Sequence, residues 1–286
     1  MPGSVRKHRH TRLFLETGAI DTRLEAMDNR FKKLGLYKQW WMALAGGVSL
    51  VAVSAAVTAS GLPSISLFRW SLQASLIVIY ILYILQRNLT LNRQDQDGPV
   101  NTTLGTANWI TIARGGLIAL LAGFCLQPWP GRDSGRTWSA WLPGIIYLAA
   151  ALGDALDGWV ARLTGSRTVL GEYLDTRIDA LGILVASLVG VGYGQLPVFY
   201  VSAGLAWYLL RLAVWLRKKS DRGCGEVKQR KSARLMAGLQ MAFLGLVLLP
   251  LFSPPTTHVA AVLILLPFLA GFALDWQMVC RHENPN

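Results

Sequence analysis

Long apolar runs dominate this sequence and constrain its fold more than any other feature. Each run approaches or exceeds the roughly 18 to 20 residues that an α-helix needs to cross the hydrocarbon core of a bilayer. The alternating segments of roughly ten residues that are typical of transmembrane β-barrels do not occur in the sequence. We therefore predict an all-α, polytopic membrane protein with about eight transmembrane helices. The predicted spans are, approximately, residues 39–60, 66–86, 108–127, 139–161, 172–194, 196–216, 234–252 and 257–280.

A polar loop at residues 87–107, rich in Asn, Gln, Asp, Gly and Thr, divides the predicted helices into two groups. The two helices before it, within residues 39–86, contain almost no ionisable residue. The six helices after it, within residues 108–280, contain a cluster of acidic residues. We therefore predict a two-helix N-terminal addition, a linker and a six-helix core, followed by a tail at residues 281–286.

The segment that precedes the first span, residues 1–38, is basic. Within it, residues 12–38 mix apolar and charged side chains at loosely helical spacing. This pattern predicts an amphipathic helix that lies in the plane of the lipid headgroups. A partly disordered basic arm is the alternative.

Lysine and arginine residues predict the orientation of the helices, because short cytoplasmic loops carry an excess of them. With the N-terminus inside, most of the 28 basic residues fall in inside segments, while the outside loops keep only Arg132 and Arg136, with Arg69 near the boundary. We therefore expect both termini, the 87–107 linker and the active site to be cytoplasmic. The expected location of the protein is the inner (plasma) membrane of a bacterium. The net charge of +12 then reflects topology and contact with anionic lipids. No nucleic-acid partner is expected, because no nucleic-acid-reading module is present.

Four aspartates lie between two of the most apolar segments, in "GDALDGWVARLTGSRTVLGEYLDTRIDA" at residues 153 to 180. Residues three and four positions apart share a face of a helix. Asp154 and Asp157 therefore form one stripe at the end of the fourth predicted span, and Asp175 and Asp179 form another at the start of the fifth. The short connection makes the two helices antiparallel neighbours that can turn these faces toward one another. We expect the four carboxylates to converge near the cytoplasmic boundary of the membrane.

Converging carboxylates repel one another and are costly to desolvate, so a bound cation, protonation or both are expected. Oxygen ligands suit hard divalent ions, and Mg²⁺ in particular binds through a few carboxylates together with substrate phosphates. The scattered cysteines and histidines show neither a disulfide framework nor zinc-ligand spacing. The acidic stripes therefore indicate phosphate chemistry at a divalent metal.

Small and basic residues on the same two helices agree with this interpretation. Gly158, Ala161 and Gly171 lie on the acidic faces, where the small side chains leave room for a ligand. Arg162 supplies a positively charged fork that can hold phosphate oxygens. The alternative is an ion-pair network of the carboxylates with Arg162, Arg167 or Arg177 that serves only packing.

The spacing of these residues resembles the motif of the CDP-alcohol phosphatidyltransferase family at all eight of its positions. The matching residues are Asp154-x2-Asp157-Gly158-x2-Ala161-Arg162-x8-Gly171-x3-Asp175-x3-Asp179. The resemblance extends over about residues 105–280, where the six predicted spans match the six-helix catalytic core of the family. The two extra N-terminal helices depart from the minimal family pattern and leave the subfamily open.

The resemblance implies an enzyme that cleaves the pyrophosphate of a CDP-linked donor, releases CMP and joins the phosphoryl group to an acceptor hydroxyl. It implies Mg²⁺ or Mn²⁺ as the cofactor, with two divalent ions held by the four aspartates. It assigns Asp179 the further role of the base that removes the proton of the acceptor, and Gly158 and Ala161 a place in the cytidine pocket. A homodimer is also implied.

The third predicted span opens with "NWITIARGG", which sets Asn108, Thr111 and Arg114 at the same level as the aspartates. Asn108, Thr111 and Gly115 share a helical face. This start resembles that of the first core helix of the family, which contacts the nucleotide, so these residues are candidate nucleotide or substrate ligands. In the alternative interpretation, Asn108 caps the helix and Arg114 extends to the membrane interface.

Basic residues near the later spans are candidates for binding an acceptor phosphate or a lipid headgroup. Lys228, Lys231 and Arg234 lead into the seventh span, where the family commonly keeps such residues, although the cytoplasmic excess of basic residues also explains them. Arg211 lies about one and a half turns inside the sixth span, and an intramembrane arginine needs a partner. Asp275 near the end of the last span is an alternative, purely structural partner.

The expected donor is CDP-diacylglycerol, because hydrophobic walls can bury its acyl chains, and the expected acceptor is a small alcohol such as glycerol 3-phosphate, an inositol phosphate or serine. A soluble CDP-alcohol of the choline or ethanolamine type, with a diradylglycerol acceptor, is the alternative. A cation transporter would carry its ionisable groups near the bilayer midplane, often in repeated halves. In this sequence the acidic residues lie near one boundary of the membrane, and no internal repeat is visible, which disfavours a transporter. A non-catalytic scaffold is a further alternative.

Overall fold

The computed structural model describes residues 34–59, 65–95, 97–130, 137–220 and 231–281. Within these ranges the chain forms eight long helices and no strand. The prediction of an all-α fold with about eight long helices is confirmed. The helices are an N-terminal helix at Leu34–Ala59, α2 at Leu67–Arg87, α3 at Thr106–Ala122, α4 at Leu142–Leu163, α5 at Val169–Gly192, α6 at Val201–Lys219, α7 at Lys231–Val247 and α8 at Pro254–Arg281. Within the same ranges, short 3₁₀ helices occur at Leu89–Leu91, Thr137–Trp141 and Val198–Tyr200.

Five of the helical stretches are long and apolar enough to cross a membrane. They are Leu34–Ala59, Leu67–Arg87, Trp138–Leu163, Val198–Lys219 and Pro254–Met278. The apolar parts of α3 and α7 are shorter, and α5 spans 24 residues but carries charged side chains in its first turns. Large apolar side chains point outward from these helices, and Phe68 and Val53 are 80% and 64% exposed. Such surfaces suit lipid rather than water, and the protein is an integral membrane protein with several passes.

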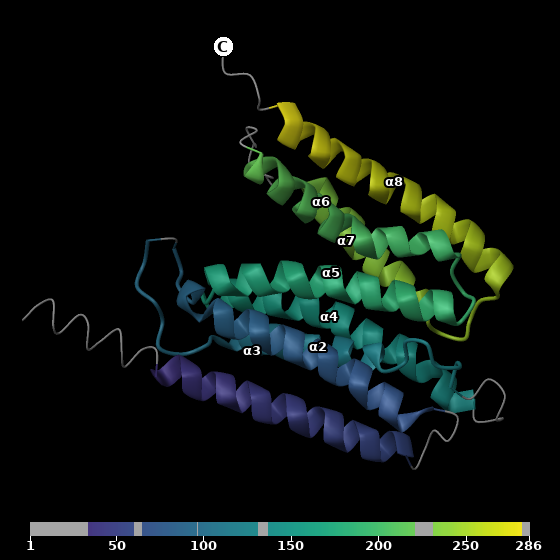
Figure 1. Ribbon diagram of the computed structural model, residues 1–286, viewed down its shortest axis with the longest axis horizontal. Coiled ribbons are helices and arrows are strands. Elements are labelled where there is room, and N and C mark those ends of the chain that lie inside the picture. The colour runs from purple at the N-terminus through teal and green to yellow at the C-terminus, as the bar shows by residue number, and fades with distance from the viewer. Residues whose placement is uncertain (1–33, 60–64, 96, 131–136, 221–230, 282–286) are drawn as a thin grey trace, which may run out of the picture.

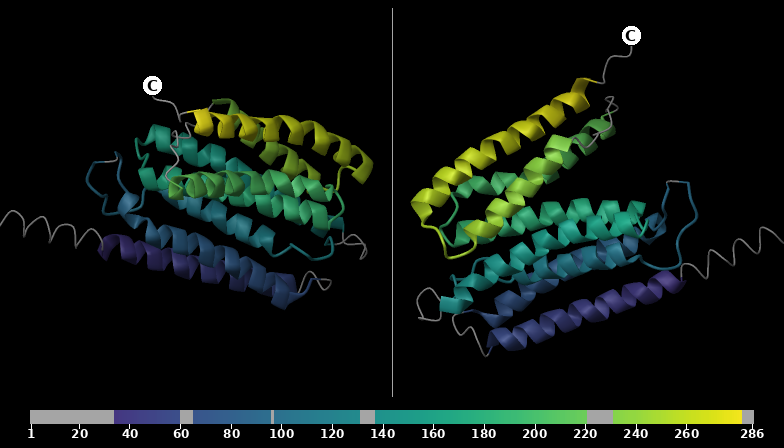
Figure 2. Two further views of the ribbon diagram at one scale, coloured as in Figure 1. Left: turned by 45° about the horizontal axis from the view of Figure 1, so that its top comes forward. Right: turned by 180° about the vertical axis from the view of Figure 1, so that it is seen from behind.

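The helices pack in an order that puts α3 at the centre of one half of the bundle. Helix α3 packs against α2, α4 and α5, while α5 also packs against α6 and α7. The N-terminal helix lies at one edge of the bundle and α8 at the opposite edge, as Figures 1 and 2 show. Helices α4 and α5, which carry the aspartates, touch each other much less than each touches α3. The two acidic stripes therefore meet across α3 and not by direct packing of α4 on α5.

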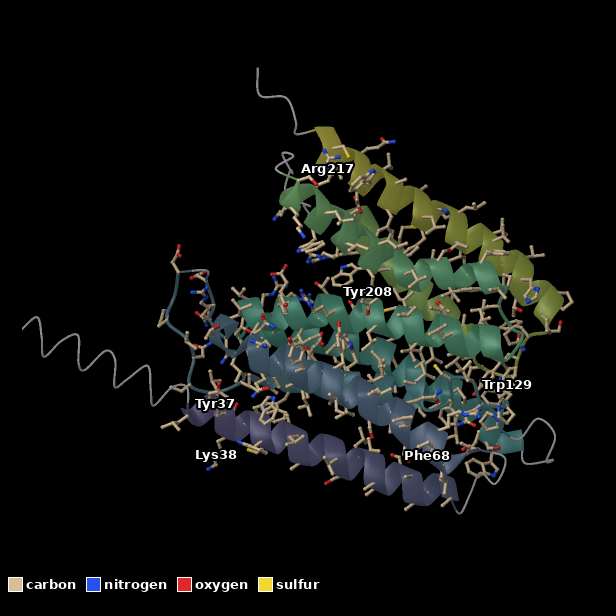
Figure 3. All side chains as sticks on the ribbon, in the orientation of Figure 1. Tyr37, Lys38, Phe68, Trp129, Tyr208 and Arg217 are labelled. Carbon is tan, nitrogen blue, oxygen red and sulfur yellow. The ribbon has the colours of Figure 1, made fainter. Side chains whose placement is uncertain are left out.

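The last turns of α4 and the first turns of α5 lie at the same end of the bundle, because a short loop joins them. We call this the acidic end, since it holds Asp154, Asp157, Asp175 and Asp179. Tyr37 and Arg217 mark the same end in Figure 3, and Phe68 and Trp129 mark the opposite one. The predicted amphipathic helix at residues 12–38 lies almost entirely outside the described residues.

Glycines let two pairs of helices approach closely. A Cβ on Gly204 of α6 would lie 2.4 Å from the Cα of Leu184 on α5, and a Cβ on Gly245 of α7 would lie 2.3 Å from Cδ2 of Leu148 on α4. Close approach of this kind stabilises helix pairs in membranes, where packing contacts replace the hydrophobic effect as the source of association. These contacts hold the second half of the bundle against the helices that carry the aspartates.

Candidate active site

The four aspartates of the acidic stripes come together at the acidic end. Carboxylate oxygens of Asp154, Asp157 and Asp175 all lie within 4.8 Å of one another. Asp179, one turn further along α5 than Asp175, joins them through a shared ion pair. The helical spacing alone explains why each pair faces the same way, because positions three or four apart share one face. The packing of α3 then brings the two faces together.

Arg114 of α3 lies at the centre of this cluster. Its Nη1 donates to Oδ1 of Asp154 at 3.1 Å, to Oδ2 of Asp157 at 2.9 Å and to Oδ1 of Asp175 at 2.9 Å. Its Nη2 donates to Oδ1 of Asp179. The stem of the arginine passes over Gly153, where a Cβ would lie 3.2 Å from Cδ of Arg114. One guanidinium thus joins α3 to both acid-bearing helices.

The four carboxylates of the cluster differ widely in their exposure. The side chains of Arg114 and Asp157 are 2% and 7% exposed, whereas those of Asp154 and Asp175 are 38% and 37% exposed. Asp179 lies between these extremes. Asp154 and Asp175 are therefore the carboxylates of the cluster that a ligand can reach most readily.

Negative charge exceeds positive charge in this cluster. If all groups are ionised, four carboxylates and one guanidinium leave three negative charges. Arg162 and Arg167 are exposed, and the guanidinium of Arg177 lies 3.4 Å from the centre of the Tyr173 ring. Among the described residues, the ion pairs of the four aspartates are all made by Arg114, so the alternative network with Arg162, Arg167 or Arg177 is not formed. The excess charge favours a bound cation.

The donor atoms suit a hard divalent cation. Mg²⁺ prefers oxygen ligands at about 2.0–2.1 Å in an octahedral arrangement, with water or substrate oxygens completing the shell. Three carboxylate oxygens within 4.8 Å of one another can reach a common ion with small side-chain adjustments. Nη1 of Arg114 contacts the same three residues, so the guanidinium and an ion at that position would compete for the same oxygens.

Asn108 and Thr111 are buried beside the cluster. Thr111 donates from Oγ1 to Oδ2 of Asp157 at 3.0 Å. Asn108 does not cap α3, because Gly105 holds the N-cap position. Arg114 does not extend to the interface, since it is only 3% exposed. Both alternative roles considered for these residues are therefore wrong.

The remaining positions of the motif line the acidic end. Ala161 is buried, and Gly158 is partly exposed, with a Cβ position 3.6 Å from Nη1 of Arg162. Gly171 is needed for a close contact, because a Cβ there would lie 2.6 Å from Oδ1 of Asn108. The small residues of the motif thus permit the packing of α3 against α5 as well as leaving room for a ligand.

The basic candidates for an acceptor site lie on other helices. Arg211 is on an exposed face of α6, with its guanidinium 5.4 Å from the centre of the Trp207 ring, and Arg234 is on an exposed face of α7. Lys231 begins α7, and Lys228 lies outside the described residues. Asp275 is buried on α8. Their role remains a prediction.

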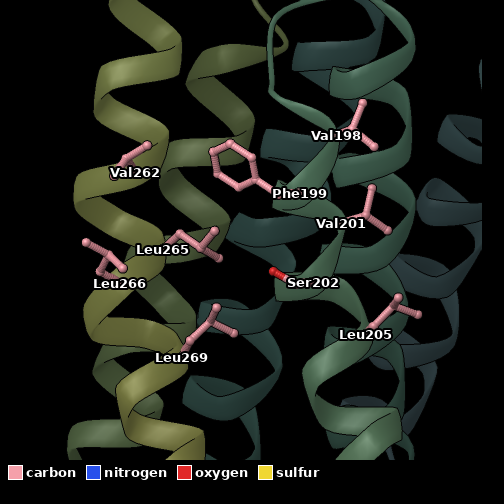
Figure 4. Close-up of a pocket in the computed structure, with 9 residues that line it drawn as sticks. All are labelled: Val198, Phe199, Val201, Ser202, Leu205, Val262, Leu265, Leu266 and Leu269. Carbon is pink, nitrogen blue, oxygen red and sulfur yellow. The ribbon is translucent and has the colours of Figure 1, made fainter.

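A cavity of about 580 Å³ lies between the first turns of α6 and the middle of α8. Figure 4 shows its lining, which is apolar except for Ser202. Because α6 starts at the end of the bundle opposite the aspartates, this cavity is separate from the acidic cluster. It contains no titratable side chain that could take part in phosphate chemistry.

Sequence reasoning missed two buried polar residues at the acidic end, Asn92 and Thr168. Thr168 is the N-cap of α5 and accepts a hydrogen bond from the backbone N–H of Gly171 at 3.0 Å. A threonine just ahead of an apolar helical run is a typical cap signal, so this residue could have been found. Asn92 lies in the loop assigned as a linker, and the sequence around it carries no comparable signal.

The fold and the cluster define a helical integral membrane protein with a carboxylate site suited to divalent ions. The sequence profile of the CDP-alcohol phosphatidyltransferase family matches residues 104–273, which is more than half of the chain. The protein therefore belongs to the CDP-alcohol phosphatidyltransferase family, and the resemblance found from the motif is confirmed.

Two curated relatives come from strains of Mycobacterium tuberculosis, CDC 1551 / Oshkosh and ATCC 25618 / H37Rv. Each is described as a probable phosphatidylglycerophosphate synthase and is 31% identical over 140 residues. The matched region covers 47% of this chain and 61% of each relative. The chain thus spans less than two thirds of the length of these relatives.

Proposed function

We propose that this protein transfers a phosphatidyl or other substituted phosphoryl group from a CDP-linked donor to an acceptor hydroxyl, with release of CMP. The observation that carries the proposal is the convergence of the four motif aspartates, from α4 and α5, at one end of the bundle. Family membership supports the same chemistry.

The aspartates are proposed to hold Mg²⁺ or Mn²⁺, with two divalent ions in the complete site. Such ions, when bound, offset negative charge on both the attacking and the leaving oxygens of a pyrophosphate. Asp154, Asp157 and Asp175 supply the carboxylate oxygens that lie closest together. Asp179 is the fourth proposed ligand.

Asp179 is also proposed as the base. The acceptor oxygen forms a bond to the phosphorus that carries the lipid, the bond from that phosphorus to the bridging oxygen breaks, and CMP takes the electron pair. The hydroxyl proton passes to a carboxylate oxygen of Asp179. Its side chain is 25% exposed, so an acceptor hydroxyl can reach it.

Residues of α3, α4 and α5 are proposed to bind the nucleotide around this centre. Gly158, Ala161, Gly171 and Arg162 would surround the cytidine and its phosphates. Asn108 and Thr111 would hold the inner side of the site, where Thr111 also orients Asp157. Arg114, once released from the carboxylates, would be free to donate its N–H groups to phosphate oxygens, which a guanidinium binds well.

The proposed donor is CDP-diacylglycerol, and the first acceptor to test is glycerol 3-phosphate. The printed description of the two relatives, probable phosphatidylglycerophosphate synthase, supports this acceptor. Arg211, Lys228, Lys231 and Arg234 are proposed to bind the acceptor phosphate or a lipid headgroup. The apolar outer faces of the helices suit a donor whose acyl chains remain in the bilayer.

The acidic end is proposed to face the cytoplasm of a bacterium, and the protein is proposed to form a homodimer. Basic residues at this end, among them Arg87, Arg93, Arg217, Lys218 and Lys219, support the orientation. The homodimer rests on the family alone. Crosslinking in native membranes that yields only monomer would remove it.

The test uses the full chain, purified in lipid nanodiscs, with CDP-diacylglycerol and either Mg²⁺ or Mn²⁺. CMP release is measured with glycerol 3-phosphate, inositol phosphate, serine and no acceptor. We expect release that depends on both the metal and one acceptor, and that stops when EDTA removes the metal. A folded protein that releases no CMP from this donor with any acceptor would overturn the proposed donor.

Two further arms cover the alternatives. CDP-choline and CDP-ethanolamine are tested with diacylglycerol as the acceptor, and product formation there would assign the lipid to the acceptor side. A liposome flux assay with Mg²⁺ or Mn²⁺ tests the transporter alternative. Metal flux without CMP release from any CDP-linked donor would overturn the enzyme proposal as a whole.

A further inference from the structure

The loop between α2 and α3 is bonded to the core at several points, although its polar sequence suggested a simple linker. The carbonyl oxygen of Arg93 accepts a hydrogen bond from the backbone N–H of Val169, the first residue of α5, at 2.9 Å. Gln94 donates from Nε2 to the carbonyl oxygen of Gly165 at 3.3 Å. The loop therefore packs directly against the connection between α4 and α5, beside the aspartates.

Asn92 is the buried centre of this loop, with 0% of its surface exposed. Its Nδ2 donates to the carbonyl oxygen of Thr103 at 2.9 Å and to that of Asn101 at 3.4 Å. The backbone carbonyl oxygen of Asn92 accepts a hydrogen bond from the backbone N–H of Asn101 at 2.7 Å. Because both N–H groups of the side-chain amide are used within the loop, its orientation is set and Oδ1 points away from those carbonyls.

The side-chain oxygen Oδ1 of Asn92 accepts a hydrogen bond from Nδ2 of Asn108 at 3.2 Å. Asn108 is 1% exposed, and its own Oδ1 accepts from Oγ1 of Thr168 at 3.2 Å. The loop amide thereby determines which way the Asn108 amide is turned, since a reversed amide would set oxygen against oxygen at Asn92. Oγ1 of Thr168 in turn accepts a hydrogen bond from the backbone N–H of Gly171, so the chain of hydrogen bonds continues into α5.

Along α3, Thr111 lies three residues and Arg114 six residues after Asn108, so both are within about two turns of it. Those two residues bond directly to Asp157. A displacement of the first turn of α3 would therefore change the position of the groups that meet the aspartates. In a low-dielectric interior, a connected chain of buried hydrogen bonds of this kind specifies one geometry, because each broken link leaves a polar group without a partner.

We propose that Asn92 is a positioning residue for the site: it orients the Asn108 amide and sets the first turn of α3 against the start of α5. The inference rests on the proposed function in one respect, that Asn108 lies in the nucleotide-binding part of the site. It also gives the N-terminal addition a role, because the loop that follows α2 completes the nucleotide-binding end of the core.

The experiment compares Asn92→Ala, Asn108→Ala and the double variant in the full chain in nanodiscs. The equilibrium Kd for CMP with Mn²⁺ and the KM for CDP-diacylglycerol are measured, together with kcat. We expect each single variant to raise both Kd and KM by about tenfold, which corresponds to the loss of one buried hydrogen bond. We expect the double variant to be no worse than Asn108→Ala, because Asn92 acts through Asn108. Effects that multiply in the double variant would overturn the proposal.

Gln94→Ala is the matched control, since Gln94 anchors the same loop to the core without contacting Asn108. It should leave Kd and KM within about twofold of wild type, as is usual for an exposed polar contact. A loss of binding in Gln94→Ala as large as that in Asn92→Ala would mean that general loosening of the loop is the cause, and the proposal would fail.

Asn92→Asp distinguishes the orientation of the Asn108 amide from the folding of the loop. The carboxylate keeps an oxygen that can accept from Asn108 but loses both N–H donors to the loop carbonyls. We expect the thermal stability of this variant to fall while its Kd for CMP stays within about threefold of wild type. If Asn92→Ala cannot be recovered folded, the comparison of Asn92→Asp with Asn108→Ala decides. A Kd for CMP in Asn92→Asp that is as high as that of Asn108→Ala overturns the proposal.

Hydrogen exchange supplies a measurement that needs no nucleotide. Asn92→Ala, but not Gln94→Ala, should raise the exchange rate of the backbone amides of Thr111 and Gly171 by about tenfold. Unchanged exchange at both amides would overturn the inference even if activity fell. If instead the wild type neither binds CMP nor releases it, the proposed function fails, and the exchange result still tests the positioning role separately.

Discussion

Nη1 of Arg114 and Oδ2 of Asp157 are 2.9 Å apart, and both side chains are almost completely buried. The same guanidinium also holds Asp154, Asp175 and Asp179. A buried arginine among four carboxylates keeps the acid-bearing helices together by supplying the positive charge that would otherwise have to come from an ion. The arrangement suggests that Arg114 and a divalent ion are alternative partners of these oxygens.

Removal of Arg114 should make the protein more dependent on metal. In Arg114→Ala the four carboxylates lose their shared counter-charge, so the metal-free protein should lose about 3–5 kcal/mol of stability. Divalent ions should bind this variant more tightly than wild type, because no guanidinium competes for the oxygens. Thermal unfolding in EDTA and in Mn²⁺ measures both effects.

The control for that experiment is Arg87→Ala, which removes an exposed arginine from the same end of the bundle. Its unfolding temperature should respond to Mn²⁺ as that of wild type does. An equal response of Arg114→Ala and wild type to Mn²⁺ would contradict competition between the arginine and the ion.

Asp179→Asn should preserve folding and metal-dependent donor binding but lose turnover. The amide keeps an oxygen that can accept from Arg114, but it cannot take the proton of the acceptor. We expect kcat to fall by about 10²–10⁴, the usual contribution of a general base. Glu172→Gln, which changes an exposed carboxylate on the same helix, should retain activity. Wild-type turnover in Asp179→Asn would show that another group is the base.

Gly171→Ala should weaken nucleotide binding through Asn108. The new Cβ would lie 2.6 Å from Oδ1 of Asn108, so one of the two must move, with a cost of about 1–3 kcal/mol. The KM for the CDP-linked donor should rise. Gly192→Ala is the control on the same helix, because a Cβ there meets no atom within 4 Å and should be neutral or slightly stabilising. Equal behaviour of the two variants would argue against a packing role for Gly171.

Gly204→Ala should destabilise the contact between α6 and α5 without touching the aspartates. The added Cβ would lie 2.4 Å from the Cα of Leu184, and a backbone atom cannot move aside as a flexible side chain can. We expect a loss of about 1–3 kcal/mol or more in thermal unfolding. Gly238→Ala, in α7, adds a Cβ where no atom lies within 4 Å. Comparable stability of the two variants would contradict the close approach of α5 and α6.

The eight helices and the grouping of the aspartates followed from local properties of the chain. Apolar runs of sufficient length predict helices in a membrane, and the period of 3.6 residues places Asp154 with Asp157 and Asp175 with Asp179. The family was also accessible, because the motif is contiguous over residues 154–179. None of these inferences required knowledge of which helices touch.

The partners of those residues were decided only by the tertiary structure. Periodicity identifies the polar face of a helix, but it does not tell which other helix meets that face. Arg162, Arg167 and Arg177 are near the aspartates in sequence, yet the packing of α3 between α4 and α5 brings Arg114 to them instead. Asn92 shows the same limit, because its burial depends on contacts with Thr103 and Asn108, and a polar loop has no periodicity from which such contacts follow.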